Sequence, residues 1–170
     1  MKTKILYLIA MVIFMNYSFG QTFETDSISQ SEVSKLHFIT GKWKGTGWMM
    51  GPNGEKTEFD QTENIQFKLD STAILIEGLG KKNEKVIHNA MAIVSYNKSE
   101  ENYSFQSYLQ NGKKGEFKAE LIGEKFYWYP NSTMRYIIEL NDKDQWYEIG
   151  EIKRGENWFQ FFEMTLDRMK

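Results

Sequence analysis

The chain has 170 residues, of which 15% are aromatic, a formal net charge of −2, and no cysteine. Charges of both signs are mixed along it, without the basic stripe typical of nucleic-acid binding. We therefore expect no nucleic-acid partner. An exported chain without disulfides has to be stabilised by its apolar core.

The first 20 residues have the three-part pattern of a cleavable secretory signal. Two lysines precede an apolar run over 5–14, and small residues follow at Ser18 and Gly20. The run is shorter than the roughly 20 apolar residues of a membrane span. We therefore predict a signal peptide over 1–20 and an exported protein, periplasmic or secreted, with no transmembrane segment after signal removal.

Residues 21–30 are polar and lack periodicity, so we expect a flexible leader there. Ser29 and Glu32 have the spacing of a capping box, and apolar residues follow. This pattern predicts a short helix over 31–38, laid across one end of a single domain that spans 31–170.

From residue 41 onward the sequence has β-rich segments separated by turn residues, with no helical periodicity. The expected strands are 42–50, 57–69, 72–80, 86–96, 103–110, 116–121, 125–129, 133–140, 145–153 and 157–168. Ten short strands with short connections favour an all-β, single antiparallel up-and-down β-barrel, because closure removes the exposed sheet edges. A two-sheet sandwich is the alternative, but it needs longer cross-over loops.

One strand has a clear division between two faces. In 57–69, Phe59, Glu63 and Ile65 share one face, and the opposite face is wholly polar. Glu63 is therefore a candidate interior carboxylate, held for structural reasons or to bind a polar head group. Such a buried charge needs a partner, and Arg135 is the counter-charge we expect.

Other strands divide less clearly. Glu77 and Glu148 are weaker interior candidates, and we expect both, with Glu163, to face water. In the last strand, alternation predicts that Trp158 and Phe162 share one face.

Gly41-Lys42-Trp43, at the start of the first strand, resembles the Gly-x-Trp signature of the lipocalins and the wider calycin group. In that group an Arg or Lys of the last strand packs over the Trp and closes the barrel, and Arg168 stands in this place. The resemblance thus implies a structural role for Gly41, Trp43 and Arg168. The longer run over 41–47 and the ten strands are more similar to the nitrobindin branch and to uncharacterised exported bacterial proteins like it.

Nitrobindins bind haem through a His near the C-terminal strands. This sequence departs from them, because its two histidines are His37 and His88. We therefore expect no haem and no other cofactor. Two unlinked histidines do not make a zinc site, and neither lies in a nucleophile motif, so we expect no metal site and no catalytic residue.

The leading hypothesis is a barrel that binds a small hydrophobic or amphipathic ligand, such as a lipid or fatty acid, in an apolar cavity. The candidate lining residues are Trp48, Phe59, Glu63, Leu75, Tyr108, Arg135, Trp146 and Phe162. One alternative is a filled barrel that acts as an interaction module for another exported protein or a glycan. The other is an enzyme that uses Glu63 with Arg135 or Tyr108.

Overall fold

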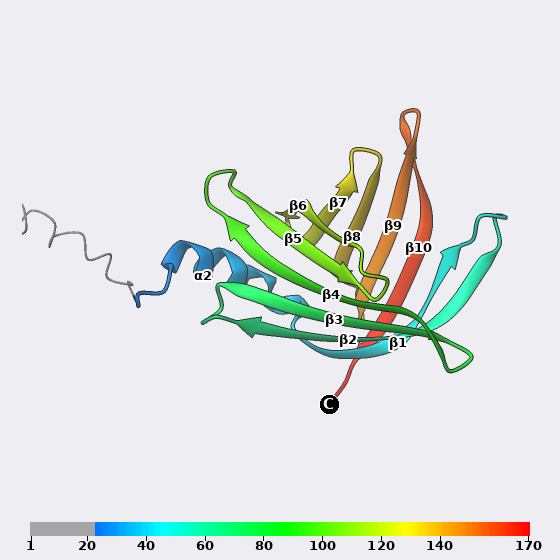
Figure 1. The fold of residues 1–170 in the computed structure, drawn as a ribbon, viewed down its shortest axis with the longest axis horizontal. Coiled ribbons are helices and arrows are strands. Elements are labelled where there is room, and N and C mark those ends of the chain that lie inside the picture. Colours follow the sequence, from blue (N-terminus) through cyan, green and yellow to red (C-terminus); the bar gives the residue numbers. More distant parts are fainter. Residues whose placement is uncertain (1–22) are drawn as a thin grey trace, which may run out of the picture.

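The computed structural model describes residues 23–170 and shows a closed antiparallel barrel of ten strands (Figure 1). Each strand pairs with the next along the chain, and β1 also pairs with β10. The strands are β1 (Gly41–Met50), β2 (Lys56–Lys68), β3 (Ala73–Lys82), β4 (Lys85–Asn97), β5 (Asn102–Leu109), β6 (Lys114–Ile122), β7 (Lys125–Asn131), β8 (Met134–Leu140), β9 (Trp146–Arg154) and β10 (Asn157–Arg168). The predicted up-and-down barrel is confirmed. The predicted signal peptide lies outside the described residues and stays a prediction.

The strand boundaries follow the turn residues. Every predicted boundary lies within two residues of the observed one. Pro130 lies inside β7 instead of in a turn, at the point where pairing with β8 is irregular between Trp128 and Asn131. A proline is tolerated there because its missing N–H interrupts no regular ladder.

The helical segment begins earlier than the sequence pattern predicts. It consists of the α-helix α2 (Ser27–Ser34) and the 3-10 helix η1 (Lys35–Ile39). The N-cap is Asp26, which accepts a hydrogen bond from the Ser29 N–H at 2.8 Å. The predicted start at residue 31 and the flexible leader through residue 30 are therefore wrong. Aspartate caps a helix as well as serine does, and Lys98 of the β4–β5 turn also pairs with this aspartate.

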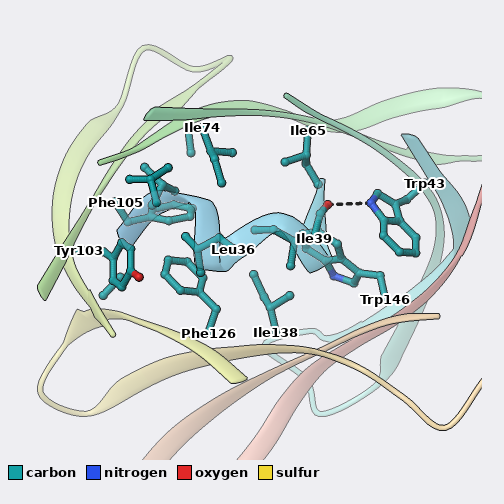
Figure 2. Close-up of a cluster of buried hydrophobic side chains, with 14 of the residues drawn as sticks. Leu36, Ile39, Trp43, Ile65, Ile74, Tyr103, Phe105, Phe126, Ile138 and Trp146 are labelled. Atoms are coloured by element: carbon teal, nitrogen blue, oxygen red, sulfur yellow. Dashed lines mark hydrogen bonds between the residues drawn. The ribbon is translucent and has the colours of Figure 1, made fainter. Parts of the chain in front are cut away.

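The helical segment closes one end of the barrel. α2 packs against β3 and β4, whereas η1 reaches β8. Leu36 and Ile39 are fully buried and point into a ring of inward side chains (Figure 2). The Trp43 indole N–H donates to the Ile39 carbonyl at 2.9 Å, which ties η1 to the start of β1. Within residues 23–170, no helix has the length and apolar character required to cross a membrane.

The exposed Arg168 stabilises the same end of the barrel by contacts with η1 and β1. Its guanidinium carbon lies 4.0 Å from the centroid of the Trp43 ring, and its nitrogens donate to the Phe38 and Thr40 carbonyls. Gly41 has a φ of +122°, and a Cβ there would lie 2.6 Å from an Arg168 nitrogen. These three residues have the arrangement that the lipocalin resemblance implies.

Candidate ligand-binding site

The strand register identifies the side chains that point into the barrel, because directly paired residues lie on the same face of a sheet. The fully buried Trp43 pairs with Glu63 on β2, while Gly47, four residues further along β1 and on the same face, pairs with Met164 on β10. Met164 in turn pairs with Glu148 on β9. Glu63 and Glu148 therefore both point inward, from the two sides of β1.

These two glutamates, which we call the carboxylate pair, are buried. Glu63 is 8% exposed and Glu148 is 7% exposed. The Gln61 side-chain amide donates to Glu63 Oε1 at 2.6 Å, and the Trp146 indole N–H donates to Glu148 Oε2 at 3.2 Å. Glu63 Oε2 is buried and has no hydrogen-bond partner in the part of the chain that the structure describes. A buried acceptor without a partner is rare, and it costs free energy unless a donor reaches it.

Burial favours the protonated forms of the pair. Loss of water raises the pKa of Glu63 to about 7, against the lowering effect of the Gln61 hydrogen bond. Burial and the nearby charge of Glu63 raise the pKa of Glu148 to about 8. None of the ion pairs within residues 23–170 includes either glutamate. Near neutral pH the pair therefore retains protons, because no cationic side chain compensates two negative charges.

Aromatic rings line the inner face next to the pair. The Trp128 ring stacks between Phe105 at 4.5 Å and Tyr136 at 4.4 Å, nearly parallel to both. Tyr136 meets Phe162 edge-on at 5.6 Å, and Phe162 stacks with Phe59 at 5.8 Å. Together with Phe117, these residues form what we call the aromatic band. Tyr136 and Phe162 both pair with Gly150, one inward position beyond Glu148, and Phe59 lies two inward positions beyond Glu63, so the band lies farther from α2 and η1 than the carboxylate pair.

The aromatic band is less completely buried than the carboxylate pair. Several side chains of the band are only half-buried, although the register directs them inward: Phe117, Trp128, Tyr136 and Phe162. At the rim, His88 is exposed and Phe159 is 48% exposed. The inner face thus has a buried polar floor, the carboxylate pair, and partly exposed aromatic rings nearer the end opposite the helix.

Inward glycines make room for these groups. A Cβ on Gly78 would lie 2.7 Å from Glu63 Oε1, and one on Gly80 would lie 2.7 Å from Gln61 Oε1. On β9, a Cβ on Gly150 would lie 2.8 Å from the Tyr136 ring. Glycines at spacing two within a strand, such as 78 and 80, are a sequence signal for the inner face that our sequence analysis did not use.

Four of the eight predicted lining residues do point inward. They are Phe59, Glu63, Trp146 and Phe162. Trp146 lies at the closed end, where its ring meets Trp43 edge-on at 5.9 Å, so it supports the floor instead of lying at the aromatic band.

The other four predicted lining residues lie on the outer face, and their predicted inward orientation is wrong. Trp48 packs under the Lys56 ammonium at 3.4 Å, and Tyr108 is 39% exposed beside Met91. Leu75 pairs with Gln66 and Ile93, in the row next to the inward Ile74 and Ile76. Both faces of that stretch are apolar, so alternation alone did not distinguish them.

Arg135 is the fourth outward residue, and it does not pair with Glu63. Its guanidinium donates to Glu151 at 2.6 Å and lies 4.1 Å from the centroid of the Trp158 ring. Trp158 and Phe162 do not share a face, because the register of β10 shifts between residues 160 and 162. A bulge of this kind adds one residue and reverses the alternation on one side of it.

The remaining carboxylate predictions divide in the same way. Glu77 is exposed and accepts from Asn64, and Glu163 accepts from Tyr147 on the outer face, as predicted. The prediction that Glu148 faces water is wrong. One face of β9 carries Trp146 and Glu148, and the other carries Tyr147 and Ile149. Both faces mix polar and apolar side chains, so the sequence pattern did not show which face points inward.

Two further hollows lie outside the inner face. One of about 510 Å³ is lined by Asp144, Asp167 and Arg168 among others, and one of about 330 Å³ lies beside α2 near Glu32 and Lys35. Both hollows include charged side chains in their linings, and the second also includes Tyr96, Tyr103, Leu121 and Ile122. Across residues 23–170, no three His, Cys, Asp or Glu side chains gather closely enough to hold a metal ion.

Neither a protein-family model nor a curated protein sequence matches this chain. Solved structures do resemble it. The crystal structure of Rv2717c from M. tuberculosis superimposes with a TM-score of 0.58 at 10% identity, over 86% of this chain and 100% of that one. Zebrafish ileal bile acid-binding protein complexed with cholic acid superimposes with a TM-score of 0.52 at 12% identity, over 78% and 99%. Identities this low establish the fold alone, which is that of a lipocalin-like β-barrel.

Proposed function

We propose that the protein binds one small hydrophobic or amphipathic molecule inside the barrel, against the aromatic band. The observation that carries this proposal is that four aromatic rings directed inward by the strand register remain partly exposed: Phe117, Trp128, Tyr136 and Phe162. The free energy falls when an apolar molecule replaces the water in contact with aromatic rings. An apolar inner face with few polar groups is the usual form of a small-molecule site.

The other two hypotheses fit the structure less well. A filled barrel requires inward side chains that exclude solvent throughout, whereas four rings of the band remain half-buried. The proposed enzymatic partners of Glu63 were Arg135 and Tyr108, and both lie on the outer face. The structural similarity to a bile acid-binding protein supports an apolar ligand in general terms, through the shared fold.

A titration with the neutral fluorophore N-phenyl-1-naphthylamine tests the proposal. Its emission rises when it leaves water, and we expect saturable binding by the wild-type protein. Ser107 is half-buried on the inner face and pairs with Ala92 and Gly115, so Ser107→Trp places an indole in the interior space. The neighbouring Gln106→Trp places the same indole on the outer face and is the matched control.

We expect Ser107→Trp to weaken fluorophore binding by about tenfold or more, because an indole displaces a ligand of its own size. Gln106→Trp should leave binding unchanged. Both variants are compared only after circular dichroism shows native strand content. Absence of wild-type binding, or equal binding by a folded Ser107→Trp, would refute an internal site.

A further inference from the structure

The floor of the inner face lacks one hydrogen-bond donor. Glu63 Oε2 has no partner within residues 23–170, although the side chain is only 8% exposed and points into the barrel. Gly78 lets this carboxylate lie directly against β3, because a Cβ there would lie 2.9 Å from the same Oε2 atom. A hydrogen-bond donor to Oε2 is therefore missing among the described residues, and the inward direction of the side chain leaves the barrel interior as the side from which one would approach.

The floor also lacks positive charge. Arg168, on the neighbouring β10, is engaged by the Phe38 and Thr40 carbonyls and by the Trp43 ring. Arg135 lies outside, on Glu151. The donors near the pair are neutral: Gln61 donates to Glu63, Trp146 donates to Glu148, and the Trp128 indole also lowers the pKa of Glu148. A cation placed between the band and the floor would meet two carboxylates and no competing ion pair among the described residues.

We propose that the carboxylate pair recognises the protonated amine of an amphipathic ligand whose aromatic or apolar body lies against the aromatic band. This inference rests on the proposed function and specifies its ligand class. An ammonium group has three donors and no acceptor, so it supplies the missing hydrogen bond to Glu63 Oε2 and compensates the charge of Glu148. A ligand with a carboxylate head group meets like charge instead.

Amine binding is coupled to proton release. The titratable groups that face the pair are the two glutamates themselves and Tyr136, with His88 on β4 nearer the rim and Arg168 on β10 at the closed end. Burial and the charge of Glu148 raise the pKa of Tyr136, so its hydroxyl stays neutral through the range in question. Binding an ammonium group favours the ionised pair, so the affinity for an amine rises as pH increases from 6 to 8.

A matched series of ligands tests this inference by isothermal titration calorimetry at pH 8. The probes are 1-naphthylmethylamine, 1-naphthalenemethanol and 1-naphthoate, which share a ring system and differ in head group. We expect the amine to bind about tenfold or more tightly than the alcohol, since a charge-assisted hydrogen bond is stronger than a neutral one. The carboxylate should bind most weakly. In the Glu63→Gln, Glu148→Gln double variant, amine and alcohol should bind equally.

The outcomes separate this inference from the proposed function. If none of the three probes binds, the proposed function fails and the inference fails with it. If the alcohol binds but the amine has no advantage, the inference is overturned and the proposed function stands. The pH series on the wild-type protein needs no variant: an amine affinity that does not change between pH 6 and 8, or that falls, contradicts the inference. Binding of Ca²⁺ alone that the double variant loses would assign the pair to a metal ion and overturn it.

Discussion

At the scale of single residues, the buried glutamates make stability depend on pH. In the folded protein the pKa is about 7 for Glu63 and about 8 for Glu148, above the ordinary value of 4.5. The folded state therefore binds more protons than the unfolded state at pH values between 4.5 and about 8. Its stability is highest at low pH within this window and falls as the pH rises through 7 and 8.

We predict that the Glu63→Gln, Glu148→Gln double variant is more stable than the wild type at pH 9, by a few kcal/mol in total. Glutamine has the same shape and does not ionise, so the variant avoids the cost of a buried charge. Urea unfolding at pH 5, 7 and 9 measures the free energies of unfolding. Glu58→Gln, at an exposed position of the same strand, is the control.

The double variant and the control should diverge as the pH rises. Parallel pH profiles for the two proteins would show that Glu63 and Glu148 ionise in the folded protein as readily as in an unfolded chain, and would contradict their burial.

The sequence predicted some of these residues and not others, for physical reasons. Glu63 was identifiable because the opposite face of its strand is wholly polar, so only one orientation buries apolar area. Leu75 was misplaced because both faces of its strand are apolar there. Arg135 was assigned to Glu63 by charge alone, and the outward Glu151 on the adjacent strand is the partner that register provides.

At the scale of elements, the helical segment determines which end of the barrel is closed. Leu36 and Ile39 are fully buried among inward side chains, whereas Ile28 near the start of α2 is 56% exposed. The segment is held by the Trp43–Ile39 hydrogen bond and by the Tyr103 hydroxyl, which donates to the Glu32 carbonyl at 2.8 Å.

We predict that Leu36→Ala lowers the free energy of unfolding by about 2–5 kcal/mol, because it leaves a cavity in the core. Ile28→Ala in the same helical segment should change it by less than about 0.5 kcal/mol. Equilibrium unfolding in urea measures both. Equal effects of the two substitutions would mean that the segment does not plug the barrel.

The strand boundaries were predictable because glycine, asparagine and proline mark the turns between strands. Two features of elements were not. The start of α2 depends on Asp26, whose capping role competes with an equally good serine pattern three residues later. The bulge of β10 was missed although the adjacent Phe161 and Phe162 interrupt the alternation at the register shift, because we continued one face through both of them.

At the scale of the whole molecule, the closed sheet and the helical segment make the two ends of the barrel different. The barrel has no free strand edge, and the helix occupies one end (Figure 1). From the end opposite the helix, the register places the exposed Phe159 and His88 first, then the aromatic band and then the carboxylate pair. In the proposed complex the apolar body of a ligand contacts the aromatic band while its head group reaches the carboxylate pair.

The most direct test of this account is a crystal structure of the protein grown with N-phenyl-1-naphthylamine. We predict one molecule inside the barrel, with its rings against Trp128 and Tyr136. Fluorophore found only on the outer face, with inward side chains filling the space beside the band, would contradict the central claim that the barrel interior is a ligand-binding site.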